Sequence, residues 1–208
     1  MNILIVAAGE CLDYDMLLEN AKESDYIICA DGGYEHLEKI KVKPDLLVGD
    51  FDSLDKKPNV ENIITLPTEK DETDTLFALK KAFKKEPQEI VIFGGIGTRF
   101  DHSYANVCLL SMCVEKNIKA VVTDGKTKIF MTDDKISFNN EKGKTISIYS
   151  FSEKCEGVTL EGFKYPLCDF TLKKDNILGT SNVIQKDEAF IKITLGKLLI
   201  ICNENKNS

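Results

Sequence analysis

The sequence predicts an α/β protein in two parts: an N-terminal open, mostly parallel α/β sheet domain and a C-terminal all-β sandwich domain. In the first part, short runs rich in Val and Ile alternate with helical patterns, which is typical of parallel strands joined by crossover helices. After Asp124 and Gly125 only short alternating runs remain, separated by turn residues, and no helix of any length fits. We therefore expect one domain at residues 1–125 and a second at 126–208.

The first part is expected to contain six buried strands and four helices. The apolar runs are short and nearly continuous, as in strands covered on both faces. They lie at residues 3–7, 26–30, 46–48, 63–66, 90–93 and 120–123. Between them, apolar residues recur at helical spacing at residues 14–22, 34–40, 72–85 and 103–116.

The second part is expected to contain seven strands. They lie at residues 128–132, 136–138, 145–151, 157–161, 169–172, 190–195 and 198–202. Because Gly196 and Lys197 separate the last two runs, these runs are predicted to pair as a β-hairpin.

Composition excludes several classes of protein. The chain has 208 residues, of which 34 are acidic and 27 basic, so its net charge of −7 disfavours nucleic-acid binding. Seven scattered cysteines without a C-x-x-C pair favour a reducing cytoplasm. Apolar runs fall far short of the roughly 20 residues that span a bilayer, and the N-terminus suits a first strand better than a signal peptide, so no membrane association is expected.

Charged residues and glycines follow four consecutive strands of the first part. In open α/β sheets the ligand lies beyond the carboxyl ends of the strands, so these residues are predicted to form one site. They are Asp31, Gly32 and Gly33; Asp50 and Asp52; Lys70, Asp71 and Asp74; and Gly94, Gly95, Gly97, Thr98, Arg99, Asp101 and His102.

Each segment also has a simpler structural interpretation. Asp31 and the two glycines after it suit a tight turn, and Asp71 or Asp74 could cap the helix that follows them. The glycine-rich segment at 94–97 matches neither a dinucleotide fingerprint nor a P-loop, and His102 could be an ordinary polar residue at a helix start. Asp50 and Asp52 are harder to explain structurally, because carboxylates two residues apart on an extended segment point the same way and repel.

A carboxylate cluster without His or Cys ligands favours Mg²⁺, which proteins often hold through one or two carboxylates and the phosphates of a substrate. Arg99 and Lys70 would balance the remaining phosphate charge. Glycines at 94, 95 and 97 would let backbone N–H groups approach phosphate oxygens. The sequence therefore predicts metal-assisted chemistry on a polyphosphate, most simply a nucleoside triphosphate.

These residues resemble the thiamine pyrophosphokinase family in its compact bacterial form. The matching segments are ADGG (30–33), PDLLVGDFDSL (44–54), KDETD (70–74) with Ala78-Leu79, GGIGTRFDH (94–102) with Ala105-Asn106, and Ser181-Asn182, in the order of the family. The chain departs from the family where Thr98 replaces the last glycine before the arginine. A positive φ there would be unfavourable for threonine.

The resemblance implies an N-terminal ATP-binding domain, a C-terminal thiamine-binding sandwich, and a homodimer with thiamine at its interface. It implies Mg²⁺-dependent transfer of pyrophosphate from ATP to thiamine, giving thiamine diphosphate and AMP. By motif position, Asp50, Asp52 and Asp74 would hold Mg²⁺, and Ser181 and Asn182 would contact thiamine. Asp71, Arg99 and Asp101 would be catalytic, and Lys70 would bind ATP together with the residues after the second and fifth strands.

Two alternatives remain open from the sequence. One is a pyrophosphokinase acting on another alcohol, such as a pterin. The other is a non-catalytic nucleotide-binding sensor, which would not need so many carboxylates of the type that bind metals.

Overall fold

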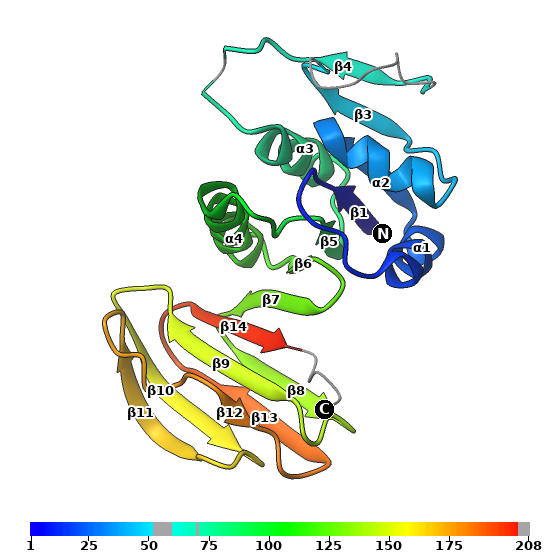
Figure 1. The fold of residues 1–208 in the computed structure, drawn as a ribbon. Coiled ribbons are helices and arrows are strands. Elements are labelled where there is room, and N and C mark those ends of the chain that lie inside the picture. Colours follow the sequence, from blue (N-terminus) through cyan, green and yellow to red (C-terminus); the bar gives the residue numbers. More distant parts are fainter. Residues whose placement is uncertain (52–59, 70, 204–208) are drawn as a thin grey trace. The chain divides into compact units, whose positions relative to one another are not determined.

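The computed structural model describes residues 1–51, 60–69 and 71–203 (Figure 1). The chain divides into two compact units, Met1–Lys126 and Thr127–Ser208. Among the described residues, no helix combines the length and apolar character needed to cross a membrane.

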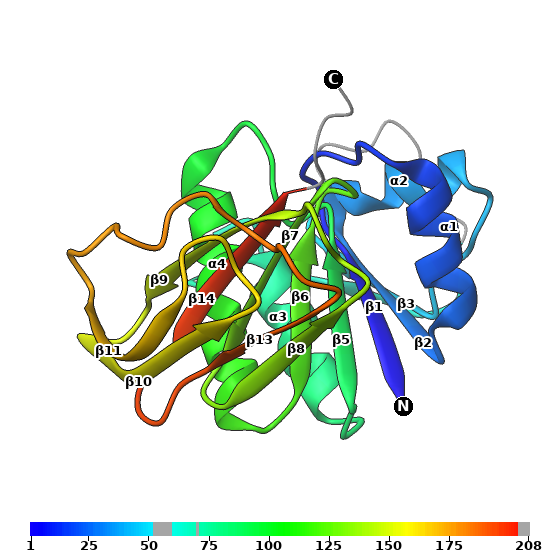
Figure 2. The same ribbon diagram turned by 90° about the horizontal axis from the view of Figure 1, so that it is seen from below.

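The first unit contains a parallel sheet, as its alternating pattern predicts. Its strands are β1 (Asn2–Val6), β2 (Tyr26–Ala30), β3 (Leu46–Gly49), β4 (Ile63–Thr65), β5 (Glu89–Phe93) and β6 (Lys119–Thr123). They lie in the order β4-β3-β2-β1-β5-β6, and Figure 2 shows the central ones side by side. The chain builds outward from β1 in one direction as far as β4 and then returns to place β5 on the other side of β1. The carboxyl ends of β1 and β5 therefore form a topological switch point, where such sheets bind ligands.

In the described part of this unit, four α-helices and one short 3₁₀ helix connect the strands. They are α1 (Tyr14–Glu23), η1 (Asp31–Gly33), α2 (Tyr34–Lys39), α3 (Asp74–Phe83) and α4 (Phe100–Glu115). Asp13 caps α1 by accepting a hydrogen bond from the Met16 N–H at 2.9 Å. Thr73 caps α3, accepting from the Leu76 N–H at 3.2 Å, so Asp71 is not the residue that caps this helix.

Both faces of the first sheet are covered. Leu4 and Val6 of β1 pack with Leu17 of α1 and Leu37 of α2, all fully buried. Ile3 and Ile5 point to the opposite face because side chains alternate along a strand, and α3 packs against β1, β2 and β3. Burial on both faces explains why the strands are nearly continuous apolar runs.

The second unit is an antiparallel sandwich, as predicted. One sheet has the order β12-β9-β14-β7 and the other β11-β10-β13-β8. The strands are β7 (Thr127–Thr132), β8 (Lys135–Asn139), β9 (Thr145–Ser150), β10 (Lys154–Glu161), β11 (Leu167–Lys173), β12 (Asn182–Val183), β13 (Glu188–Lys192) and β14 (Leu198–Asn203). Their inward side chains form one buried core, to which both sheets contribute.

The predicted hairpin at Gly196 is wrong. β13 pairs with β8 and β10, whereas β14 pairs with β7 and β9, so the two strands belong to different sheets. The chain does turn at Gly196, which has φ +100°. However, Leu195, the residue before this turn, forms an antiparallel bridge with Glu156 and not with a residue of β14. An alternating pattern identifies a half-buried strand without identifying its partner. The two-residue strand β12 was not predicted.

Removing a core side chain should show how far the sandwich contributes to stability. Leu198 is fully buried between the sheets, whereas Leu195 is 55% exposed. We expect Leu198→Ala to lower the free energy of unfolding by about 2–5 kcal/mol through lost burial and the cavity left behind. Leu195→Ala makes the same chemical change at the surface and should cost far less. Urea denaturation of both variants measures this difference, and equal losses would contradict the assigned core.

Candidate active site

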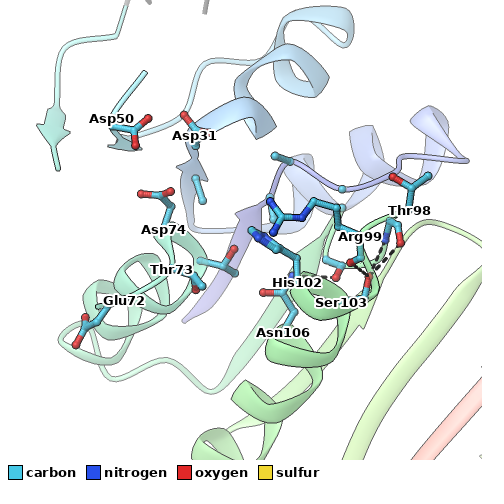
Figure 3. A pocket seen from close by; sticks show the side chains of 18 of the residues that line it. Asp31, Asp50, Glu72, Thr73, Asp74, Thr98, Arg99, His102, Ser103 and Asn106 are labelled. Atoms are coloured by element: carbon cyan, nitrogen blue, oxygen red, sulfur yellow. Dashed lines mark hydrogen bonds between the residues drawn. The ribbon is translucent and has the colours of Figure 1, made fainter. Parts of the chain in front are cut away.

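A cavity of about 700 Å³ lies at the carboxyl edge of the parallel sheet (Figure 3). Its walls come from the segments after β1, β2, β3 and β5 and from the first turns of α3 and α4. The cavity therefore includes the switch point between β1 and β5, where the fold leaves a crevice between loops that run in opposite directions.

Three aspartates line one side of the cavity: Asp31, Asp50 and Asp74. Ala30 pairs with Val48 across β2 and β3, which brings the residues after both strands together. Asp74 is the first residue of α3, a helix that packs against both strands. Figure 3 shows the three side chains grouped together.

The environment of Asp31 makes its negative charge unfavourable. Burial raises the pKa of this carboxyl above its ordinary value, and the nearby charges of Asp74 and Asp50 raise it further. Hydrogen bonds from the backbone N–H groups of Gly32 and Phe51 act in the opposite direction without cancelling the shift. The Oδ1 atom of Asp31 is buried and has no hydrogen-bond partner among the described residues. A carboxylate in this state is suited to a cation.

In the described part of the chain, no three His, Cys, Asp or Glu side chains converge closely enough to enclose a metal ion. Asp52, one of the predicted ligands, lies outside the described residues. An open arrangement of carboxylates is compatible with Mg²⁺, because this ion is usually bound by one or two carboxylates and completed by water and substrate phosphates.

An arginine and a histidine line the other side of the cavity. Arg99 and His102 point into it across from the carboxylates (Figure 3). Arg99 is the only arginine in the sequence, and its side chain is 69% exposed. Its Nη2 lies 2.7 Å from Oδ2 of Asp101 and its Nε 3.4 Å from Oδ1. The hydrogen bond from Arg99 lowers the pKa of the Asp101 carboxyl, so Asp101 remains ionised and orients the guanidinium.

Side chains of α4 hold the loop that follows β5. The hydroxyl of Ser103 accepts from the Gly97 N–H at 3.0 Å and lies within 3.2 Å of the carbonyl oxygens of Gly97 and Arg99. Asn106, which is buried, donates to the Gly95 carbonyl at 2.8 Å. Thr98 is not one of the described residues with positive φ, so threonine causes no backbone strain at the position where the family usually has glycine.

Gly9 joins the segment after β1 to this loop. Its N–H donates to the Gly94 carbonyl at 2.8 Å, and the Glu10 N–H donates to the Ile96 carbonyl at 2.6 Å. A Cβ atom at position 9 would lie 2.3 Å from the Gly94 oxygen and 2.4 Å from the Ile96 oxygen. Only glycine permits this close approach.

Sequence reasoning missed Gly9, Ser103 and Asn106 as residues that shape the site. The rule that ligands lie beyond strand ends, applied to the first strand as well, would have found Gly9. Nothing in the sequence assigns Ser103 and Asn106 to the loop, because their hydrogen bonds depend on how α4 folds back beside it.

Most of the predicted ATP and metal residues are brought together in the cavity, and a few are not. Those that line it are Asp31, Asp50, Asp74, Gly94, Gly95, Gly97, Thr98, Arg99 and His102. Asp71 and Asp101 are exposed residues that do not line it. Lys70, like Asp52, lies outside the described residues.

Gly32 and Gly33 do not line the cavity either. A Cβ atom on Gly33 would lie 2.3 Å from the carbonyl oxygen of Val6. This glycine therefore allows η1 to pack tightly against the end of β1. Its predicted contact with ATP remains a prediction.

The residues predicted to contact thiamine lie in the second unit. Asn182 is 6% exposed, and its amide donates to the Tyr165 carbonyl at 2.7 Å and accepts from the Tyr165 N–H at 3.0 Å. Ser181 is exposed, has φ +58°, and donates its N–H to the Ser147 hydroxyl at 3.0 Å. The side chain of Asn182 is therefore hydrogen-bonded to the backbone of Tyr165, whereas Ser181 is exposed at the surface.

Comparisons with known proteins agree with this division of the chain. Residues 17–122 match the family model described as thiamin pyrophosphokinase, catalytic domain, and residues 133–204 match thiamin pyrophosphokinase, vitamin B1 binding domain. The chain is 32% identical to a thiamine pyrophosphokinase of Bacillus subtilis over 207 residues, covering 96% of this chain and 97% of the relative. It is 25% identical to thiamin pyrophosphokinase 1 of Caenorhabditis elegans, covering 88% of this chain and 81% of that one.

The structure is also similar to solved structures. A crystal structure of thiamine pyrophosphokinase from Bacillus subtilis superposes with a TM-score of 0.88 at 29% identity, covering 99% of this chain and all of the other. A thiamin pyrophosphokinase family protein from Enterococcus faecalis gives a TM-score of 0.82 at 25% identity, with 99% and 100% coverage.

Neutralising Asp31 should stabilise the metal-free protein while impairing its function. Because the pKa of Asp31 is raised in the fold, the folded state binds more protons than the unfolded chain between the ordinary and the raised pKa. The free energy of unfolding therefore falls as pH rises through that interval. We expect metal-free Asp31→Asn to melt at a higher temperature than the wild type at pH 7, and its turnover to fall about 100-fold.

Asp45→Asn is the matched control, because Asp45 accepts a hydrogen bond from the Ile27 N–H at 2.8 Å and does not line the cavity. It should not raise the melting temperature and should leave turnover nearly unchanged. Thermal denaturation in EDTA and a turnover assay test both variants. A lower melting temperature for Asp31→Asn would show that its charge is already compensated.

Proposed function

Because the chain belongs to the thiamin pyrophosphokinase family, we propose that its cavity binds ATP with Mg²⁺ and that the residues facing each other across it carry out the transfer. Members of this family are pyrophosphotransferases that make thiamine diphosphate from thiamine and ATP. The observation that carries the proposal is the opposition of three carboxylates to Arg99 and His102 across one cavity at the switch point.

The reaction requires one bond to form and one to break. The hydroxyl oxygen of thiamine forms a bond to the β-phosphorus of ATP. The bond from this phosphorus to the oxygen bridging the α- and β-phosphates breaks, which releases AMP and a proton. Such transfers require mainly positioning and neutralisation of charge.

The donor chemistry of the cavity suits Mg²⁺. Asp31, Asp50 and Asp74 supply hard carboxylate oxygens, and the buried Oδ1 of Asp31 without a hydrogen-bond partner among the described residues is the clearest such atom. We propose that Asp50 and Asp74, together with Asp52, hold the ion, with Asp31 beside them. When bound, Mg²⁺ supplies charge neutralisation at the phosphate oxygens and at the leaving group.

The opposite wall is suited to the phosphates. Arg99 can bind phosphate oxygens through its planar fork, and its pairing with Asp101 fixes the direction in which the fork points. The first turn of α4 lies beside Arg99 and lines the cavity through His102 and Ser103. Lys70, Gly94, Gly95, Gly97 and Thr98 complete the proposed ATP contacts, with Gly32 and Gly33 nearby.

Asp71 and Asp101 are the proposed acceptors of the hydroxyl proton. The hydrogen bond from Arg99 lowers the pKa of the Asp101 carboxyl, which makes Asp101 a poor acceptor of the proton. We therefore favour Asp101 as the residue that orients Arg99, and we assign the proton to Asp71.

We also propose that residues 1–125 bind ATP and that residues 126–208 bind thiamine at the interface of a homodimer, with Ser181 and Asn182 in that site. Exposed apolar side chains on both units support an interface: Phe100, Tyr104, Tyr165, Ile177 and Leu178. All seven cysteines are free, which supports a reducing compartment such as the cytoplasm.

Product analysis tests the function directly. The protein is incubated with ATP and Mg²⁺, with and without thiamine, and AMP and thiamine diphosphate are quantified. We expect both products in equal amounts and only when thiamine is present. AMP formed only with another alcohol, such as a pterin, would support a different pyrophosphokinase, and binding of ATP without any AMP would support a nucleotide sensor.

Arg99→Lys should lower kcat about 100-fold, because a point charge cannot replace the fork of the guanidinium. The single arginine allows a second measurement on the wild type. Phenylglyoxal, which modifies arginine, should inactivate the enzyme, and ATP with Mg²⁺ should protect it. Arg99→Lys serves as the control, since its residual activity should resist the reagent. Near-normal turnover of Arg99→Lys would remove Arg99 from the reaction centre.

A further inference from the structure

A chain of hydrogen bonds reaches the cavity from the side of α1 and α2. Lys39 Nζ lies 2.9 Å from the hydroxyl oxygen of Tyr14, which lies 3.0 Å from Nδ1 of His36. The other ring nitrogen of His36, Nε2, lies 2.8 Å from the carbonyl oxygen of Gly9. Tyr14 and His36 are both partly buried.

The chemistry of the groups fixes the direction of this chain. The carbonyl of Gly9 can only accept, so Nε2 of His36 carries the hydrogen. In the neutral ring Nδ1 is then an acceptor, and it receives the hydrogen of the Tyr14 hydroxyl. The ammonium of Lys39 can only donate, and it donates to the Tyr14 oxygen. Each group therefore donates to the next one in the order Lys39, Tyr14, His36, Gly9. By donating to Nδ1, Tyr14 favours the tautomer of His36 whose Nε2–H donates to the Gly9 carbonyl.

Gly9 is the point at which this chain can affect the site. Its carbonyl is held by His36, while its N–H is held by Gly94 on the opposite side. Glycine has more backbone freedom than any other residue, and no larger residue fits here. The peptide groups around Gly9 therefore depend on these external hydrogen bonds for their orientation.

We propose that His36 is a positioning residue for nucleotide binding. By donating to the Gly9 carbonyl, it holds the segment after β1, and through Gly94 and Ile96 the loop after β5, in the shape that receives the phosphates. His36 does not line the cavity and acts only through Gly9. The inference rests on the proposed role of the cavity in binding ATP.

Two substitutions separate the hydrogen bond from the bulk of the side chain. His36→Leu removes the donor and should weaken binding of ATP with Mg²⁺ about tenfold, which corresponds to the loss of one hydrogen bond. His36→Gln retains an N–H donor and should bind ATP within about threefold of the wild type. Titration calorimetry with ATP measures the affinities, and steady-state assays should show that the KM for thiamine is unchanged in both variants.

Asn20→Ala is the control for a general effect of lost hydrogen bonds, because Asn20 donates to the Met16 carbonyl within α1 and does not line the cavity. Its ATP affinity should match that of the wild type. If His36→Leu does not fold, Tyr14→Phe replaces it. In this variant nothing fixes the tautomer of His36. ATP binding should weaken two- to threefold, which corresponds roughly to the low end of the usual contribution of one hydrogen bond.

The outcomes distinguish this inference from the proposed function. Wild-type ATP affinity in folded His36→Leu, or in Tyr14→Phe where it is used instead, would overturn the role of His36 alone. Failure of folded His36→Gln to recover binding would also overturn it, because the donor would then not be the relevant feature. If the wild type turns over thiamine, but substitutions at Arg99 and Asp31 leave ATP affinity unchanged, the proposal that this cavity binds ATP would be overturned.

Discussion

The site depends on a concentration of negative charge around one cavity. Asp31, Asp50 and Asp74 come from three separate segments and face the same cavity, and their mutual repulsion, together with burial, raises the pKa of Asp31. Such an arrangement reduces the stability of the metal-free fold. Under the proposed function, a cation shared with a phosphate ligand would offset this cost, which links the raised pKa of Asp31 to the substrate that the family uses.

The topology of the first unit provides the space in which this charge can be used. The order of the strands reverses between β1 and β5, and the cavity lies at this switch point, between the carboxylates and Arg99. The loops themselves contain many glycines and need support from outside. Ser103 and Asn106 supply it from α4, and His36 supplies it through Gly9.

Much of the fold and site was predictable because its signals are local. Apolar runs identified the parallel strands, and the rule that ligands lie beyond strand ends brought Asp31, Asp50 and Arg99 together correctly. Pairing between distant strands was not local, and the hairpin predicted at Gly196 failed for that reason. The supports of the glycine loops were missed for a similar reason, since a serine or a histidine on a helix does not reveal which backbone carbonyl it will meet.

The most direct test is a crystal structure with Mg²⁺ and an ATP analogue that has a methylene group between the α- and β-phosphates. This analogue cannot react, because the bond that would break in ATP is replaced. The account predicts the triphosphate inside the cavity, the ion bound directly by carboxylates of Asp31, Asp50 or Asp74 and by phosphate oxygens, and the Arg99 fork on the phosphates. A triphosphate bound elsewhere, or an ion that touches no protein carboxylate, would contradict it.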